Sequence, residues 1–552
     1  MPKRKPDTED AEWWRGAVIY QVYVRSFRDS DGDGIGDLKG VLEGLDHIAS
    51  LGVDAVWISP IYKSPQKDFG YDVADFRVVD RLAGSMEDFM ALLDAAHARG
   101  LKLLLDFIPC HTSDEHPWFD ESRQSRTNPK ADWYVWADRQ EDGTPPNNWL
   151  SSFGGGAWEW EPRRSQYYYH AFLKEQPALN LHNEEVLEHL VSEMRFWTNL
   201  GVDGFRIDAV QCLAWDQDLR SNPPVGRDGS RALIGGGATN PFAAQLHIFD
   251  RHARGTHRIL ERFRRFADET GCFLIGEMAD IDTAAAAADY TKPGQRLHAV
   301  YDFDLINCQS EVDSVTSQLR RRSALLAGGW SYNVFSNHDS KRAVSNLTGF
   351  AVQDLRIEAA KLLLFMQMTL KGGCIIYQGE ELGLPHPKLS YEEIVDPWAK
   401  AFWPTFEGRD GARTPLPWVG TDENGGFTTG KPWLPLATEH LPLNAATQAE
   451  DPNSVLSFVS AFAAWRKDNE VLRFGEEEIT EGENAPVITW RRRFGRRELK
   501  MVVNFSTDEA FLPLEPEWRL VVAPGCIARR GPHGVSLNPL GFAIAQPNGK
   551  AR

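Results

Sequence analysis

The sequence predicts an α/β protein whose core is a (β/α)8 TIM barrel, with a subdomain inserted after the third strand and an antiparallel β domain at the C-terminal end. Three observations support this prediction. Eight short apolar runs end in polar or acidic residues and are followed by stretches with helical spacing, a pattern typical of parallel strands joined by helices. The connection after the third run is far too long for a single helix. Beyond residue 470 the pattern changes to short alternating strands.

The eight predicted strands are mostly apolar at odd and even positions alike. Runs such as VDAVWIS and LKLLLDFI have this character, which is expected when a sheet is covered inside and outside. Between the second and third strands, Phe89, Leu92, Leu93 and Ala96 recur at helical spacing and Gly100 follows, so a helix is predicted over 85–99. The predicted strands span 18–27, 53–59, 101–108, 202–208, 272–278, 297–303, 332–337 and 374–378.

The chain divides into three predicted domains. The barrel (domain A) is expected over 12–108 and 182–469. The inserted subdomain (domain B) is expected over 109–181, which carries the segments PPNNW, SFGGGAW and QYYYH. A second irregular stretch, 383–442, is rich in Pro, Gly and Trp and precedes a last predicted helix over 454–467. The small β domain (domain C) is expected over 470–552, where VITWRRRF and LKMVVNFS indicate antiparallel strands.

The charge balance restricts the partners of the protein. Its 552 residues include 60 basic and 78 acidic side chains, a formal net charge of −18, and such an excess of acid repels phosphate backbones and anionic lipid surfaces. Nucleic acid and membrane are therefore not expected as partners, whereas a small neutral substrate is. The sequence shows no apolar signal or membrane segment, and its six cysteines are scattered singly. We expect a cytoplasmic enzyme with reduced thiols, monomeric or homodimeric, without an organic cofactor.

Polar side chains close several of the predicted strands. Active sites of such barrels are built at the C-terminal strand ends, so these side chains should meet at one mouth. Each residue alone has a structural alternative: Asp106 could cap a loop, and Arg206 could merely neutralise Asp208. Loop capping does not require acids at the ends of strands four, five and seven together. Their joint occurrence therefore favours a catalytic role for these residues. The residues concerned are Asp106, His111, Arg206, Asp208, Glu277, His338 and Asp339.

Two carboxyl groups about 5 Å apart can carry out double-displacement hydrolysis of a glycoside, one as nucleophile and one as proton donor. Arg206 lies two residues before Asp208, on the same side of the strand, and would hold that carboxylate ionised. Glu277, in the apolar run FLIGEM, is expected to have a raised pKa and to carry a proton. Asp339 and the two histidines could hydrogen-bond sugar hydroxyls.

A separate acidic segment, DSDGDGIGD over 29–37, has the spacing of a calcium loop. Its carboxylates fall at positions 1, 3, 5 and 9, with Gly34 at position 6. Gly40 stands at position 12, where such a loop expects a glutamate, and the segment follows a strand rather than a helix. An acidic, solvated turn is the alternative. The spacing favours one structural divalent cation over a calcium-sensing module.

Four segments resemble the signature regions of glycoside hydrolase family 13, the α-amylase family. They are DFIPCH over 106–111, GFRIDAV over 204–210, IGEM over 275–278 and SNHD over 336–339. The resemblance implies that Asp208 is the nucleophile, Glu277 the general acid/base and Asp339 the stabiliser of the transition state. Flanking segments such as WWRGAVIYQVYVRSF, DFGYDVADF and GRDGARTPLPW are similar to the α-glucosidase and oligo-1,6-glucosidase branch.

Membership of that branch would imply further site residues. The pocket for the non-reducing glucose would be lined by Asp68, Tyr71, His111, Arg206, His338 and Arg409, with Phe153 and Phe172 as aromatic walls. The branch has a divalent ion in the loop corresponding to 29–37. The implied ligands of Ca²⁺ or Mg²⁺ are Asp29, Asp31, Asp33, the Ile35 carbonyl and Asp37.

The resemblance also bears on linkage specificity. Ala209 follows the nucleophile; in similar enzymes alanine or threonine there accompanies α-1,4 preference, and valine accompanies α-1,6 preference. Two positions depart from the family pattern: Cys110 replaces a usual Asn, and Ala178 replaces the acid of QPDLN. The first is expected to change a hydrogen bond behind the site, the second to remove a contact within the subdomain.

The expected activity is that of a retaining exo-α-glucosidase acting on maltose-type short oligosaccharides, with sucrose and transglucosylation as further possibilities. Trehalose synthase-type or sucrose isomerase-type glucosyl transfer and oligo-1,6-glucosidase activity are the alternatives, because the same intermediate serves all of them. A non-enzymatic alternative is a heavy chain of an amino-acid transporter, which resembles the barrel. That class needs a membrane helix and lacks the carboxylate set, so it fits this chain poorly.

Overall fold

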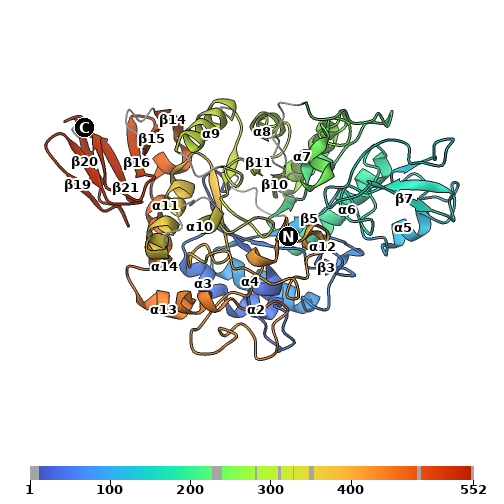
Figure 1. The fold of residues 1–552 in the computed structure, drawn as a ribbon, viewed down its shortest axis with the longest axis horizontal. Coiled ribbons are helices and arrows are strands. Elements are labelled where there is room, and N and C mark those ends of the chain that lie inside the picture. Colours follow the sequence, from blue (N-terminus) through green and yellow to red (C-terminus); the bar gives the residue numbers. More distant parts are fainter. Residues whose placement is uncertain are drawn as a thin grey trace.

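The computed structural model describes residues 12–226, 239–279, 283–308, 312–326, 328–346, 353–480 and 486–548. Its centre is a closed barrel of eight parallel strands in the order β1-β13-β12-β11-β10-β9-β5-β2 (Figure 1). This confirms the predicted barrel. The strands are β1 (Val18–Val22), β2 (Ala55–Ile58), β5 (Lys102–Phe107), β9 (Gly204–Ile207), β10 (Phe273–Met278), β11 (Ala299–Asp302), β12 (Ser331–Asn333) and β13 (Gly373–Tyr377).

All eight observed strands overlap the predicted runs, but their ends differ. The seventh run, predicted over 332–337, ends four residues early, because β12 leaves the ladder after Asn333. The following residues form the loop that carries His338 and Asp339 instead of continuing the strand. The first run also ends early, since a short 3-10 helix occupies Val24–Ser26.

The strand register stacks a polar layer above an apolar one inside the barrel. Ile19, Trp57, Leu104 and Ile275 belong to a buried cluster to which several barrel strands contribute. Because side chains alternate with period two, Asp106 lies on the same face as Leu104, two residues nearer the carboxyl end. Its partner in the register is Arg206 of β9, and Glu277 of β10 pairs with Tyr301 of β11. The predicted catalytic residues therefore share one end of the barrel.

Helices cover the outside of the barrel. The predicted helix over 85–99 is α4 (Met86–Ala98): Ser85 and Asp88 form a capping box at its start, and Phe89, Leu92, Leu93 and Ala96 are buried. Within the described residues, no helix is long and apolar enough to cross a membrane. The other long helices are α6 (Glu184–Leu200), α7 (Thr256–Thr270), α8 (Thr283–Tyr290), α9 (Val312–Leu325), α11 (Arg356–Thr369) and α14 (Val455–Lys467), and the shorter ones include α2 (Leu38–Glu43), α3 (Leu45–Ser50), α10 (Ala343–Asn346) and α13 (Ala445–Glu450).

The connection between β5 and α6 folds as a small subdomain. It contains α5 (Pro117–Ser122) and a three-stranded antiparallel sheet in the order β6-β8-β7. The strands are β6 (Trp136–Ala137), β7 (Trp158–Glu161) and β8 (Gln166–Tyr169). A hairpin of β3 (Tyr62–Lys63) and β4 (Asp75–Val79) precedes it. The limits 109–181 themselves stay a prediction.

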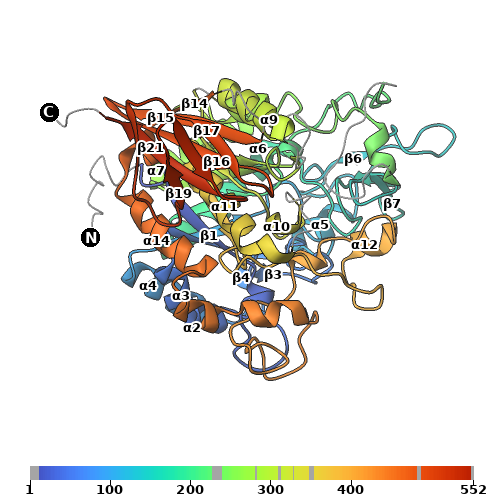
Figure 2. The same cartoon turned by 60° about the vertical axis from the view of Figure 1, so that its left-hand side comes forward.

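The C-terminal region consists of antiparallel strands, as predicted, and they form two sheets. In both views these sheets lie at the end of the molecule opposite β7 (Figures 1 and 2). The sheet orders are β14-β15-β16-β21-β18 and β17-β20-β19. The short helix α15 (Glu470–Phe474) comes first, followed by β14 (Glu476–Thr480), β15 (Val487–Phe494), β16 (Arg497–Asn504), β17 (Ala510–Pro513), β18 (Trp518–Leu520), β19 (Ala528–Arg530), β20 (Gly534–Leu537) and β21 (Phe542–Pro547).

Candidate active site

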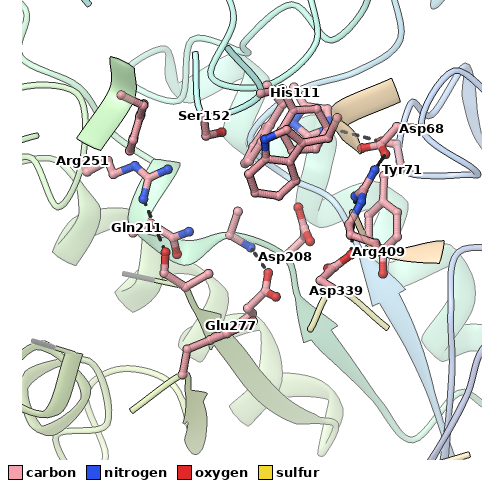
Figure 3. Close-up of a pocket in the computed structure, with 17 residues that line it drawn as sticks. Asp68, Tyr71, His111, Ser152, Asp208, Gln211, Arg251, Glu277, Asp339 and Arg409 are labelled. Atoms are coloured by element: carbon pink, nitrogen blue, oxygen red, sulfur yellow. Dashed lines mark hydrogen bonds and ion pairs between the residues drawn. The ribbon is translucent and has the colours of Figure 1, made fainter. Parts of the chain in front are cut away.

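A pocket of about 720 Å³ of space, continuous with solvent, opens at the carboxyl end of the barrel (Figure 3). Asp208 and Glu277 face it from below, with Asp68, Tyr71, Asp339 and Arg409 on one side and Gln211 and Arg251 on the other. The remaining lining residues are His111, Ser152, Phe153, Phe172, Ala209, Phe242, Ala279, Phe303 and Trp398.

Arg206 joins the acids at the floor of the pocket. One terminal nitrogen, Nη1, lies 2.5 Å from Asp106 Oδ1 and 2.5 Å from Asp208 Oδ1. The other, Nη2, lies 2.7 Å from Glu277 Oε2, an ion pair without hydrogen-bond geometry. The guanidinium is fully buried, and three neighbouring carboxyl groups raise its pKa well above the usual value despite burial. A permanent cation therefore lies between the two proposed catalytic carboxyls.

Glu277 is held in a way that suits a proton donor. Burial raises its pKa to about 7, although Arg206 opposes the shift. Its Oε2 accepts a hydrogen bond from the Ala209 backbone N–H at 3.2 Å, and its Oε1 accepts one from the Tyr301 hydroxyl at 3.2 Å. A carboxyl with a pKa near neutrality can give and take a proton at physiological pH.

Asp208 has a different environment. Burial raises its pKa to about 7 as well, and Arg206 again opposes the shift. Asp208 accepts a direct charge-assisted hydrogen bond from Arg206, whereas Glu277 has only the ion pair. Such bonds favour the ionised acceptor. When the two carboxyls share one proton, we therefore place it on Glu277.

Asp339 is the acid most firmly held in the ionised form. Its Oδ1 accepts a hydrogen bond from Arg413 at 2.5 Å and a longer one from Arg409 at 3.4 Å. Burial alone would raise its pKa, but His338, Arg413 and Arg409 lower it well below the usual value. Asp339 therefore presents a negative charge to the pocket across the whole physiological range.

A buried network forms the wall beyond Asp339. Arg409 Nη2 donates to Asp68 Oδ1 at 2.8 Å and to Asp396 Oδ1 at 2.9 Å. Gln176 reaches from the inserted subdomain and donates to Asp68 Oδ2 at 3.1 Å. Asp68, Arg409 and Asp396 are each at most 4% exposed. This wall can offer fixed donors and acceptors to the hydroxyls of one sugar ring.

Aromatic rings adjoin this polar wall at the rim of the pocket. Phe153 stacks on Trp398, with ring centroids 4.6 Å apart and an angle of 17° between planes. Phe172 packs edge-on against both Phe153 and His111. The Arg409 guanidinium lies 4.9 Å from the centroid of Phe153. The inserted subdomain and the loop after β13 therefore meet at this wall.

Ten of the twelve predicted catalytic and substrate-binding residues line the pocket, whereas Arg206 and His338 do not. Both are fully buried: Arg206 extends beneath Asp208, and the His338 ring is covered by Tyr71 (stacked, centroids 5.4 Å apart). This differs from the expectation that they line it; direct contact with substrate stays a prediction for both. The ten are Asp68, Tyr71, His111, Phe153, Phe172, Asp208, Ala209, Glu277, Asp339 and Arg409.

Sequence reasoning missed several residues that shape this site. Trp398 and Asp396 lie at the start of α12 (Pro397–Phe402), which the Asp-Pro pair could have indicated as a helix start. Arg413 lies four residues after Arg409 in the segment GRDGAR, and nothing in that segment indicated that Arg413 also contacts the site. Phe242 and Arg251 come from the long connection after β9, of which 227–238 lie outside the described residues.

Three positions singled out in the sequence have a defined place in the structure. Ala209 adopts a left-handed backbone conformation, φ 42° and ψ 53°, which is unfavourable for alanine and which turns the chain at the end of β9. Cys110 Sγ lies 3.2 Å from His111 Nδ1, behind the pocket. Ala178 packs in a small apolar cluster of the inserted subdomain.

The acidic loop 29–37 groups three of its predicted ligands. Asp29, Asp31 and Asp37 offer oxygen atoms that all lie within 4.8 Å of one another, a donor set that suits Ca²⁺ or Mg²⁺. Asp33 lies outside this group and accepts a hydrogen bond from the Ile35 N–H at 2.8 Å. The ligand roles of Asp33 and of the Ile35 carbonyl stay predictions.

Gly34, at position 6 of this loop, has a packing reason of its own. Its φ is +92°, and an added Cβ would lie 1.9 Å from the Lys431 carbonyl oxygen. Asp29 ties the loop to the same region, since its Oδ2 accepts a hydrogen bond from the Thr428 hydroxyl. The loop is therefore anchored to the segment after β13.

Comparison with known proteins agrees with this geometry. The family described as "Alpha amylase, catalytic domain" matches residues 21–475. The chain is similar to a probable α-glucosidase of Rhizobium meliloti (strain 1021), 46% identical over 91% of each chain, and to an oligo-1,6-glucosidase of Heyndrickxia coagulans, 35% identical over 93% of this chain and 95% of the relative. It is also similar to the solved structure of the α-glucosyl transfer enzyme XgtA, with 45% identity, a TM-score of 0.93 and coverage of 97% and 99%. The chain belongs to the α-amylase family and is a glycoside hydrolase.

Proposed function

We propose that the protein is a retaining exo-α-glucosidase that removes terminal, non-reducing α-linked glucose from short maltose-type oligosaccharides. The observation that carries this proposal is the buried Asp68–Arg409–Asp396 network on one side of the catalytic carboxyls. A wall of fixed, buried polar groups suits one terminal glucose and obstructs a chain that continues past it. Polysaccharide cleavage within a chain would need a groove open at both sides.

The first chemical step forms a covalent glucosyl-enzyme. Asp208 attacks the anomeric carbon, and Glu277 transfers its proton to the leaving glycosidic oxygen as that bond breaks. Arg206 keeps the nucleophile ionised and aimed through the 2.5 Å hydrogen bond. The ionised Asp339 stabilises positive charge that develops on the ring in the transition state.

The second step releases the sugar with retained configuration. Glu277, now ionised, takes a proton from water, and the resulting nucleophile attacks the anomeric carbon and frees Asp208. Both carboxyls contact the same guanidinium, which favours the short separation of retaining enzymes over the wider one that inverting enzymes need for an intervening water. Proton NMR of the glucose first released from p-nitrophenyl α-glucoside, which contains no second glucose, tests this: retention requires initial α-glucose, and initial β-glucose would refute it.

Ala209 supports a preference for α-1,4 bonds. It lines the pocket directly after the nucleophile, and its small side chain leaves room on the leaving-group side. Comparing kcat/KM for maltose and isomaltose tests the preference, and a higher value for isomaltose would support the oligo-1,6-glucosidase alternative instead. Adding maltotetraose and starch tests the preference for short substrates, because activity on starch equal to that on maltose would contradict it.

Transfer of glucose to an acceptor other than water is the second candidate. The similar XgtA structure is described as an α-glucosyl transfer enzyme, and Gln211, Phe242 and Arg251 form a side of the pocket where an acceptor could replace water. Product analysis with maltose, sucrose and an added alcohol separates the outcomes: free glucose indicates hydrolysis, an alkyl glucoside indicates transfer, and trehalose or an isomerised sucrose indicates rearrangement.

A divalent cation at Asp29, Asp31 and Asp37, with Asp33 and the Ile35 carbonyl, would have a structural role. Bound there, Ca²⁺ or Mg²⁺ would neutralise the repulsion between these carboxylates and fix the loop between β1 and α2. The proposal includes no organic cofactor. It also includes a cytoplasmic location, a monomer or homodimer, and a small neutral oligosaccharide as substrate.

A further inference from the structure

Gln21 is a buried polar residue that has no assigned role in the reaction. It lies in β1, where it pairs with Trp57 of β2 and Tyr377 of β13, and it is completely shielded from solvent. Its amide nitrogen lies 2.7 Å from Nδ1 of His338. The two residues are 317 positions apart in the chain, so the fold brings a strand-one amide directly behind the loop that carries Asp339.

The ring of His338 has little freedom other than the position of its proton. It stacks between Tyr71, with centroids 5.4 Å apart and a 6° angle, and Tyr23, with centroids 5.5 Å apart and a 20° angle. Burial lowers the pKa of His338 to about 3, so the imidazole is neutral near neutral pH. A neutral imidazole has one N–H, on Nδ1 or on Nε2.

The surroundings of the ring select one of these two tautomers. If the Gln21 amide nitrogen faces Nδ1, it can only donate, and the ring proton must be on Nε2. The reverse amide orientation would place the proton on Nδ1 and leave the Nε2 lone pair 3.2 Å from Asp339 Oδ2, a carboxylate with a low pKa. In either orientation, the amide atom of Gln21 that faces away from His338 has no described partner, so the amide itself does not distinguish the two tautomers. The contact with the Asp339 carboxylate does, and it favours the proton on Nε2.

This tautomer sets the direction of a chain of hydrogen bonds. Nε2–H donates to the Tyr71 hydroxyl at 2.6 Å, which leaves the hydroxyl proton free to donate to Asp106 Oδ2 at 3.0 Å. Asp106 Oδ1 in turn accepts from Arg206 at 2.5 Å, and the same nitrogen donates to Asp208. With the proton on Nδ1, Nε2 would become an acceptor, and the single Tyr71 proton could serve either His338 or Asp106 but not both.

We propose that Gln21 is a positioning residue for the reaction centre: it holds His338 in the Nε2–H tautomer and so directs the Tyr71 hydroxyl to Asp106, which anchors Arg206 against the nucleophile. The link to the reaction rests on the proposed function, since it takes Asp208 as the nucleophile. The tautomer itself does not depend on any substrate. The charged groups that surround the ring are Asp339, Arg206, Arg409 and Arg413.

The experiment combines a spectroscopic readout with kinetics. Nitrogen-15 NMR of protein labelled with [15N]histidine, without substrate, reports which ring nitrogen of His338 carries the proton; the signal is assigned by its loss in His338→Asn. Gln21→Glu places an acceptor against Nδ1 and should move the proton from Nε2 to Nδ1. We expect kcat on maltose to fall about 10- to 100-fold, which corresponds to about 1.4 to 2.8 kcal/mol, with KM changed less than threefold.

Two further variants keep the proposal falsifiable. Gln21→Met removes the donor without adding an acceptor and should give a smaller loss of kcat; it also replaces Gln21→Glu if that variant fails to fold. Gln367→Met is the matched control, because Gln367 is a similarly buried glutamine whose amide, among the described residues, donates to the backbone carbonyls of Asn333 and Ile375 and not to a histidine. This variant should lower Tm without changing the His338 signal.

The outcomes separate this proposal from the proposed function. A wild-type His338 protonated on Nδ1, an unchanged tautomer in Gln21→Glu, or an equal loss of kcat in Gln367→Met would each overturn the role of Gln21. If the tautomer moves as expected but the wild-type enzyme does not release glucose from maltose, the proposed substrate is wrong and the positioning role remains.

Discussion

Asp396 is the residue whose replacement tests the glucose-binding wall most directly. Its carboxylate is fully buried and accepts hydrogen bonds from the Arg409 backbone N–H at 2.9 Å, from Nε at 3.2 Å and from Nη2 at 2.9 Å. It also accepts one from the Trp398 N–H at 3.1 Å. The same side chain therefore positions the arginine that binds Asp68 and starts the helix that carries an aromatic wall residue.

Asp396→Asn keeps the size of the side chain but removes its charge and turns one acceptor into a donor facing Arg409. A hydrogen bond to a charged group contributes about 1.5–3 kcal/mol, and the loss of one partner of a buried ion pair costs about 3–5 kcal/mol. Arg409 keeps Asp68 and Asp339 as partners, so we expect the lower range to act on substrate binding. That range corresponds to a loss in kcat/KM for maltose of about 10- to 150-fold, mainly through KM.

Steady-state kinetics on maltose, together with the thermal midpoint, measure this effect. Asp410→Asn is the control, because Asp410 is equally buried in the same loop, but within the described part of the chain its carboxylate accepts from the backbone N–H groups of Val395 and Asp396 and not from Arg409. It should lower Tm without a comparable rise in KM. An unchanged KM in Asp396→Asn, or an equal rise in both variants, would refute the reasoning that Asp396 acts through Arg409 on the glucose subsite.

Three further predictions concern the carboxyl pair, the linkage and the cation. Because burial raises the pKa of both Asp208 and Glu277 to about 7, and the reaction needs the first ionised and the second protonated, kcat/KM should peak near neutral pH. It should fall at lower pH as Asp208 gains a proton and at higher pH as Glu277 loses one; a flat profile between pH 5 and 9 would contradict this. Ala209→Val should raise the isomaltose-to-maltose ratio of kcat/KM. Ala209→Thr introduces the same β-branching at this strained position and should leave the ratio unchanged. If both variants have the same ratio, residue 209 does not set the linkage preference. Chelation with EDTA should lower Tm by a few degrees, since a cation present at 100 times its Kd contributes about 2.7 kcal/mol to the free energy of unfolding. The variant Asp31→Asn should make Tm insensitive to EDTA. Loss of activity at constant Tm would exclude a purely structural cation.

The barrel and the acids at its mouth could be predicted because both follow from local periodicity. A strand buried on both faces leaves an apolar run, and the polar residue that ends it marks the mouth of the barrel, as for Asp106, Asp208 and Glu277. The pairing of Asp106 with Arg206 and of Glu277 with Tyr301 then follows from the order of the strands.

The walls of the pocket could be predicted only through the family resemblance, or not at all. Arg409 contacts Asp68 across 341 positions of sequence, and both lie in irregular segments where no periodicity fixes the direction of a side chain. Asp396 and Trp398 lie in the same kind of segment. Their positions depend on tertiary contacts such as the packing of Trp398 on Phe153, which a single sequence does not encode in any local pattern.

The charge count beneath the pocket explains why one of its acids keeps a proton. Arg206 forms ion pairs with Asp106, Asp208 and Glu277. If all three acids were ionised, one positive charge would face three buried negative charges. Burial raises the pKa of each acid, to about 6 for Asp106 and about 7 for the other two. Asp106 and Asp208 both accept direct hydrogen bonds from the guanidinium, whereas Glu277 does not. The guanidinium shared by the three acids, together with the lack of a direct hydrogen bond from it to Glu277, therefore favours Glu277 as the group that keeps the proton, in line with its proposed role as the acid.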